Sequence, residues 1–194
     1  MKTPKNPRSK AGFTLIELLV VITIIAVLAA AGFASGNAAM QRARKVTAQA
    51  AATSIVTSID QFYSEYSALP SGTGTLPTGT GGSGVAVINI LAGLETGTTI
   101  ENDRKIKFLS LKESKNGKRD GAVFNTAGTS INALFDPWGR PYYIVMDDNY
   151  DERISITPGN SIPQVNLNGR RAAAYSLGVK VDNLATSGTF VKTW

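Results

Sequence analysis

The amino-acid sequence predicts an α+β fold in which a long N-terminal α-helix packs on a small antiparallel β-sheet. No proline occurs between Pro7 and Pro70, and apolar residues recur there at helical spacing. The second half of the chain instead contains short β-prone runs separated by glycine, proline and aspartate. With 194 residues, the chain is long enough for one ordinary domain.

The composition excludes several kinds of active site. The chain contains no cysteine and no histidine. Ser-His-Asp and Cys-His nucleophilic sites, thiolate or imidazole zinc sites and disulfides are therefore excluded. A metal ion would have to be bound by oxygen ligands, as calcium and magnesium are. Because paired carboxylates at helical spacing are also missing, we expect a protein that is not an enzyme.

The positive charge lies mostly at the N-terminus. The net charge is +6, but residues 1–12 hold four of the cations and no acid, which leaves 16 cations and 14 acids in the remainder. A nucleic-acid interface needs a basic patch on the folded domain, so we expect no nucleic-acid partner. Two small basic clusters, at 104–107 and 112–119, are interpreted as solvated loops and turns.

An apolar run follows this basic segment. Residues 13–34 contain only three polar side chains, those of Thr14, Glu17 and Thr23, and about 20 apolar residues suffice to span a bilayer. The positive-inside rule then places residues 1–12 in the cytoplasm and the remainder outside.

A cleaved secretory signal peptide is the alternative interpretation of this run, with residues 29–31 as the cleavage site. The length of the run argues against it. So does Glu17, because a carboxylate in lipid is costly and needs a partner.

The helix is expected to continue beyond the membrane, from Phe13 to Tyr66. Apolar side chains share one helical face in its second half: Ile55, Val56, Ile59, Phe62, Tyr63 and Tyr66. We therefore expect a transmembrane and assembly helix at 13–36, a soluble half of the helix at 37–70, and a globular region at 71–194.

The globular region is predicted to begin with a flexible Gly/Thr-rich loop at 71–84 and a short helix or extended run at 85–94. Residues 101–120 are charged and include a short extended segment. A turn at 135–141 is expected to lead into a strand at 142–146, followed by strand 153–157, which would complete a hairpin. A third strand is expected at 173–178, and Trp194 is expected to pack on the domain.

The segment from Lys10 to Val21, KAGFTLIELLVV, resembles the processing site of type IV pilins and type II secretion pseudopilins. This resemblance implies a pilin-like fold and cleavage of the leader 1–12 between Gly12 and Phe13 by a prepilin peptidase. It also implies N-methylation of Phe13 by the same enzyme and retention of the apolar helix.

The resemblance also suggests a role for Glu17. In a stack of parallel helices, the carboxylate of one subunit would lie beside the Phe13 amine of a neighbour. Pairing would remove two uncompensated buried charges and set the register between subunits. The alternative is a carboxylate that extends to the cytoplasmic interface without a partner.

A second resemblance comes from the C-terminal half. The segments Asp136–Tyr142 and Tyr175–Gly178, followed by Trp194, are similar to the major pseudopilin of type II secretion. Ordinary type IV pilins usually carry two C-terminal cysteines, which this chain lacks. Residues 71–130 depart from the compact pseudopilin pattern.

This resemblance implies an inner-membrane protein that crosses the membrane once, with its globular region in the periplasm. It would polymerise with itself and with minor pseudopilins on an inner-membrane assembly platform driven by a separate cytoplasmic ATPase. The periplasmic filament would help to move exoproteins across the outer membrane. The alternative is a type IV pilin in a surface fibre for adhesion, motility or DNA uptake.

Calcium is the one cofactor that the resemblance implies, since major pseudopilins hold it in the loop after the Ser-x-Gly strand. Here Ser176 and Asp182 are the candidate ligands in that region. A second candidate is the turn with Asp147, Asn149 and Asp151, whose oxygens have the 1-3-5 spacing of a calcium loop. It lacks the later ligands of an EF-hand and is otherwise a solvated turn.

Overall fold

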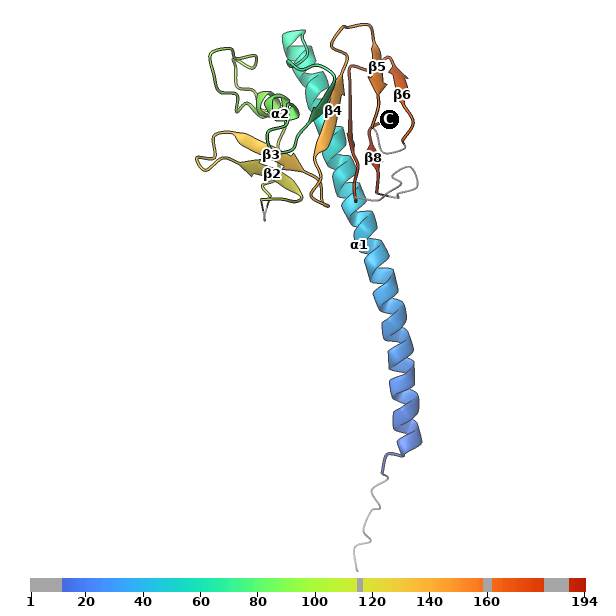
Figure 1. Ribbon diagram of the computed structural model, residues 1–194. Helices are drawn as coiled ribbons and strands as arrows, with labels where there is room; N and C mark the ends of the chain where they lie inside the picture. The colour runs from blue at the N-terminus through green and yellow to red at the C-terminus, as the bar shows by residue number, and fades with distance from the viewer. Residues whose placement is uncertain (1–11, 115–116, 159–161, 180–188) are drawn as a thin grey trace, which may run out of the picture. The chain divides into compact units, whose positions relative to one another are not determined.

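The computed structural model describes residues 12–114, 117–158, 162–179 and 189–194, without the side chains of residues 31–35. The chain divides into two compact units, Met1–Met40 and Gln41–Trp194. The second unit is called the globular unit below. The first helix, α1, contributes residues to both units (Figure 1).

Helix α1 spans Leu15–Tyr66 and confirms the long helix expected over residues 13–66. It ends where Ser67 adopts a left-handed conformation with φ of 53°. The residue before a proline is disfavoured in helical geometry, so Pro70 keeps the helix from continuing beyond this point. Over the described residues, neither helix combines the length and the apolar character that crossing a membrane requires.

One face of α1 forms the core of the globular unit. Five side chains spaced by three or four residues are at most 1% exposed: Ala48, Ala52, Ile55, Ile59 and Phe62. This confirms the predicted apolar stripe and extends it by two alanines towards the N-terminus. The small alanines allow close approach of the neighbouring strands to the helix.

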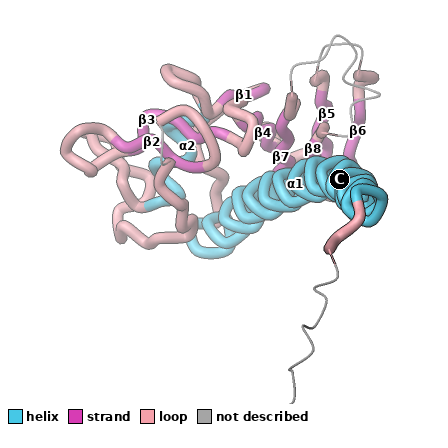
Figure 2. The backbone as a smooth tube through the Cα atoms, turned by 90° about the horizontal axis from the view of Figure 1, so that it is seen from below, coloured by secondary structure: helices cyan, strands magenta, loops and turns pink. Residues whose placement is uncertain are grey.

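A four-stranded antiparallel sheet covers this helical face. Its strands are β1 (Thr75–Pro77), β4 (Tyr142–Met146), β7 (Ala172–Ser176) and β8 (Val191–Lys192), in the order β1-β4-β7-β8. In Figure 2 they lie along one side of α1. The predicted strands at 142–146 and 173–178 are thereby confirmed as β4 and β7, which pair with Tyr143 opposite Tyr175.

Two smaller sheets and a second helix complete the globular unit. Strands β2 (Gly121–Phe124) and β3 (Ile131–Phe135) form one antiparallel pair, and β5 (Arg153–Ile156) and β6 (Val165–Asn168) form the other. The run at 85–94 is expected from the sequence to form either a short helix or an extended segment. It forms helix α2 (Gly84–Ala92), which Gly93 caps with φ of 69°.

The predicted hairpin of strands 142–146 and 153–157 is wrong. Strand β5 does not pair with β4, because β1 occupies one edge of β4 and β7 occupies the other. It pairs with β6, a strand that the sequence analysis did not predict.

The predicted loop at 71–84 is also wrong in part, because it contains strand β1. Leu76 is buried opposite Ile144 on strand β4. The Thr78 hydroxyl donates to the carbonyl of Leu134 over 2.8 Å and accepts from the backbone N–H of Tyr142 over 3.0 Å. Tertiary pairing thus orders a segment whose composition is typical of a flexible loop.

The extended segment predicted within residues 101–120 packs on the core without forming a long strand. Leu109 is fully buried, and its backbone N–H donates to the carbonyl of Leu91 at 2.9 Å. A single bridge joins Glu113 to Ala122 of strand β2.

Candidate functional site

The predicted processing site lies immediately before α1. Gly12 and Phe13 are exposed and precede the first helical residue, Leu15. A Cβ atom added at Gly12 would meet no other atom within 4 Å, so the fold itself does not require glycine at this position. The rest of the predicted leader, residues 1–11, lies outside the described residues.

Thr14 and Glu17 form a capping box at the start of α1. The Thr14 hydroxyl accepts from the backbone N–H of Glu17 at 3.3 Å. The Glu17 carboxylate accepts from the backbone N–H of Thr14 at 2.9 Å and from its hydroxyl at 2.7 Å. These reciprocal bonds satisfy N–H groups that the first helical turn leaves without intrahelical partners.

The sequence analysis missed this role of Thr14, although a threonine followed three positions later by glutamate is its signal. The capping box also gives Glu17 a partner within its own chain. Pairing of Glu17 with the Phe13 amine of a neighbouring subunit stays a prediction.

The helix that follows the capping box presents apolar side chains on all sides. Leu15 is 88% exposed, and every other large apolar side chain described between Phe13 and Leu28 is at least 45% exposed. An exposed apolar surface of this extent marks a membrane or protein interaction surface. This unit therefore needs cover from lipid or from other helices.

The two C-terminal segments that resemble pseudopilins meet in the globular unit. The buried Asp136 carboxylate accepts from the backbone N–H groups of Trp138 and Arg140, at 2.9 and 2.8 Å. Its second oxygen accepts from the hydroxyl of Ser176 on β7. Burial raises the pKa of Asp136, and these hydrogen bonds oppose that rise. Asp136 thus joins the β3–β4 turn to strand β7.

Trp194 packs on the domain as predicted. Its ring makes an edge-to-face contact with the ring of Tyr175 on β7, with centroids 6.0 Å apart. Phe190 contacts both rings, and Tyr143 stacks on Tyr175 at 5.0 Å. Burial raises the pKa of Tyr175 to about 12, so its hydroxyl stays neutral at physiological pH.

The candidate calcium ligands do not converge in the described part of the chain. Ser176 bonds to Asp136, and Asp182 lies outside the described residues. The buried Asp147 carboxylate accepts from the backbone N–H groups of Asp151 and Glu152, at 3.1 and 2.8 Å. Asp147 therefore stabilises its own turn.

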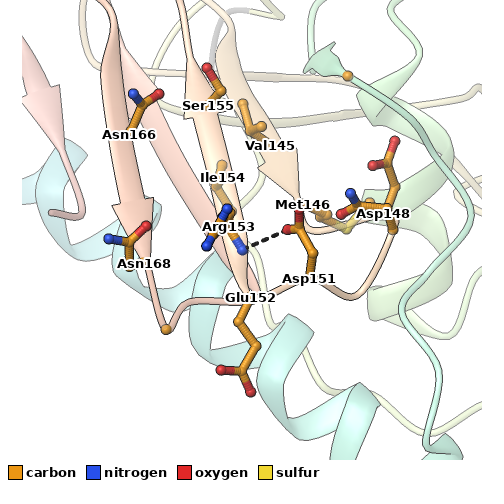
Figure 3. A pocket seen from close by; sticks show the side chains of 13 residues that line it. Val145, Met146, Asp148, Asp151, Glu152, Arg153, Ile154, Ser155, Asn166 and Asn168 are labelled. Carbon is orange, nitrogen blue, oxygen red and sulfur yellow. Dashed lines mark hydrogen bonds between the residues drawn. The ribbon is translucent and has the colours of Figure 1, made fainter.

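The other two candidates of this turn, Asn149 and Asp151, are exposed beside an open polar groove of about 940 Å³. Figure 3 shows Asp148 and Asp151 in this groove, with Asn166 and Asn168 on β6. No group of three or more acidic side chains placed to hold a metal ion occurs among the described residues. Calcium binding stays a prediction.

Comparison with known proteins identifies the N-terminal segment. Residues 7–33 match the family model described as the prokaryotic N-terminal methylation motif. No curated protein and no solved structure matches the chain. The motif supports a type IV prepilin-like protein, which the prepilin peptidase processes and methylates.

Proposed function

We propose that this chain is a structural subunit of a type II secretion pseudopilus, and not an enzyme. The observation that carries the proposal is the continuity of the methylation motif with one long helix. In the N-terminal part of that helix, large apolar side chains lie exposed. Such a surface is stable only when lipid or neighbouring helices cover it.

Lipid and neighbouring helices would cover this apolar surface at successive stages of filament assembly. Before assembly, residues 13–36 anchor the subunit in the inner membrane, with the N-terminus in the cytoplasm and the globular unit in the periplasm. During assembly, the same apolar surface packs against the helices of other subunits. The chain polymerises with itself and with minor pseudopilins, on a membrane platform driven by a separate ATPase.

Two features favour the pseudopilus over a type IV pilus. The Asp136–Ser176 bond joins the two segments that resemble the major pseudopilin. The chain also has no cysteine, so the terminal disulfide loop usual in type IV pilins cannot form.

Processing is tested by mass spectrometry of the mature N-terminus. We expect a chain that begins at N-methylated Phe13 and a Gly12→Val variant that keeps its leader, because the peptidase must accommodate a residue without a side chain. Gly36→Val is the matched control, since a Cβ atom there also meets nothing within 4 Å. A mature start near Gly32 would instead indicate a signal peptide and end the proposal.

The kind of filament is tested by co-expression with the assembly machinery of a type II secretion system. We expect short periplasmic filaments and secretion of exoproteins that depends on this subunit. Long surface fibres, with exoprotein secretion unaffected by loss of the subunit, would favour the type IV pilin.

A further inference from the structure

Three segments of the globular unit that carry basic side chains meet at the turn of Trp138. The Trp138 indole N–H donates to the side-chain oxygen of Gln41 on α1 at 3.1 Å, so the β3–β4 turn lies against the helix. The backbone N–H of Asp120 donates to the carbonyl of Asp136 at 2.8 Å, which places residues 118–120 against the same turn. The Lys118 carbonyl and the Arg119 side chain also lie within 4 Å of a Cβ atom built at Gly139. The basic patch is defined here as the cations of these three segments: Arg42, Arg44, Lys45, Lys118, Arg119 and Arg140.

The cations of the basic patch form no ion pair with any acidic side chain that the structure describes. The ion pairs among the described residues are Arg104–Glu65 and Lys112–Asp120, and neither includes a member of the patch. Asp136 is buried and its oxygens accept hydrogen bonds from its own turn and from Ser176. The patch therefore presents positive charge to a partner outside the chain.

Acidic side chains lie towards the other end of the globular unit. Asp60 and Glu65 are exposed near the end of α1, and the turn 147–152 is held beside that end by the hydrogen bond from the Leu69 N–H to the Tyr150 hydroxyl. At a rise of 1.5 Å per residue, Glu65 is about 36 Å along the helix from Gln41. Cations also occur near this end, since Arg104 pairs with Glu65 and Arg171 lies over the Tyr63 ring, but the acidic groups lie far from the basic patch.

Apolar and aromatic groups accompany the cations. Val46 on α1 is 69% exposed next to Lys45, and the ring of Trp138 is half-buried. Tryptophan is enriched at membrane–water interfaces. Cations beside exposed apolar side chains are typical of surfaces that lie on a bilayer. Charge and apolar character together fit lipid headgroups better than a purely polar partner.

We propose that the basic patch docks the globular unit on anionic phospholipid headgroups while the subunit waits in the membrane. This rests on the proposed function, in which residues 13–36 anchor the chain, so that Arg42 follows the anchor by six residues. Each Lys or Arg near an anionic surface strengthens association about fivefold. Assembly into a filament then has to detach the patch from the lipid.

The test uses the full chain reconstituted in vesicles and Trp138 as the reporter. Trp138 and Trp194 are the two tryptophans of the chain, so Trp194→Phe leaves Trp138 as the sole indole. Vesicles of phosphatidylcholine alone are compared with vesicles that also contain phosphatidylglycerol, each carrying a headgroup spin label that quenches nearby indoles. Amide hydrogen exchange of residues 117–120 and 136–140 in the unsubstituted chain gives a second measurement.

We expect quenching of Trp138 to be about twofold or more stronger in the anionic vesicles and to fall at high salt. The triple variant R42Q/K45Q/K118Q should lose this difference. The matched control K105Q/K107Q/R153Q removes the same charge from exposed positions outside the patch and should retain it. Inorganic phosphate should not compete, because it offers no extended surface.

The outcomes separate this proposal from the proposed function. Failure of the chain to float with either kind of vesicle would contradict the membrane anchor itself. If the chain floated with both kinds of vesicle, but Trp138 quenching and amide hydrogen exchange did not depend on lipid charge, only the proposed docking surface would be overturned. If Trp138 emission changed with chain concentration instead of lipid charge, the patch would bind the acidic end of a second copy, and lipid docking would be overturned.

Discussion

Replacing Asp136 by alanine should destabilise the globular unit more than any exposed substitution. The change removes the acceptor of three hydrogen bonds, from Ser176, Trp138 and Arg140, at a side chain that is fully buried. Hydrogen bonds to charged groups contribute about 1.5–3 kcal/mol each and are not additive. We therefore expect a loss of about 3–5 kcal/mol in the free energy of unfolding, or roughly 10 °C in Tm.

The coupling between Asp136 and Ser176 is the sharper measurement. Ser176→Ala alone should cost about 1–2 kcal/mol, because the carboxylate keeps its two backbone donors. In the double variant the second substitution should cost less, by a coupling energy of about 1–2 kcal/mol. Thermal unfolding of the full chain in detergent, followed by near-ultraviolet circular dichroism, reports on both tryptophans, which lie in the globular unit.

Ser155→Ala is the matched control for this cycle, since it removes a serine hydroxyl from an exposed strand position. It should change stability by less than about 0.5 kcal/mol. Effects of Asp136→Ala and Ser176→Ala that simply add would refute the reasoning, because they would show that the two side chains stabilise the unit independently.

Three further predictions concern pH, assembly and calcium. Burial raises the folded-state pKa of Asp136, so the folded state binds the Asp136 proton more tightly than the unfolded state does. The stability that comes from this tighter proton binding is fully present below the unfolded-state pKa and is lost as the pH rises through the folded-state pKa, whereas the hydrogen bonds of the carboxylate remain. The difference in Tm between wild type and Asp136→Asn should therefore decrease from pH 3 to pH 7, and a constant difference would contradict this. Glu17→Gln should keep the capping box with Thr14 yet reduce filament yield as Glu17→Ala does, while membrane insertion stays normal; full yield from Glu17→Gln would assign Glu17 to capping alone. Millimolar calcium should raise the Tm little, whereas a saturated site at 100 times its Kd would add about 2.7 kcal/mol; a large rise abolished by Asp182→Ala or Asp151→Ala would establish the corresponding loop as the site.

The long helix could be predicted because its signal is local. Between Phe13 and Tyr66 no proline interrupts the chain, and Ile55, Ile59 and Phe62 already show the face that packs on the sheet. The processing site is equally local, since the methylation motif occupies consecutive residues. The capping box also has a local signal, because Thr14 and Glu17 have the three-residue spacing that this motif requires.

Strand pairing could not be predicted, because it depends on residues far apart in the chain. Strand β1 lies in a Gly/Thr-rich segment and forms only because Leu76 and Thr78 meet β4 and its flanking residues. Sequence proximity favoured a hairpin of β4 with β5, but β1 and β7 already occupy both edges of β4.

The sequence by itself determined the processing motif, the apolar N-terminal segment and the helix that extends from it, since each depends on neighbouring residues. The tertiary structure alone decided which strands pair, that Ser176 bonds to Asp136 across 40 positions of the chain, and that three segments carrying basic side chains meet at the turn of Trp138. These contacts depend on how the chain closes on itself. No local spacing encodes that closure, because each contact becomes favourable only once the shared core is buried.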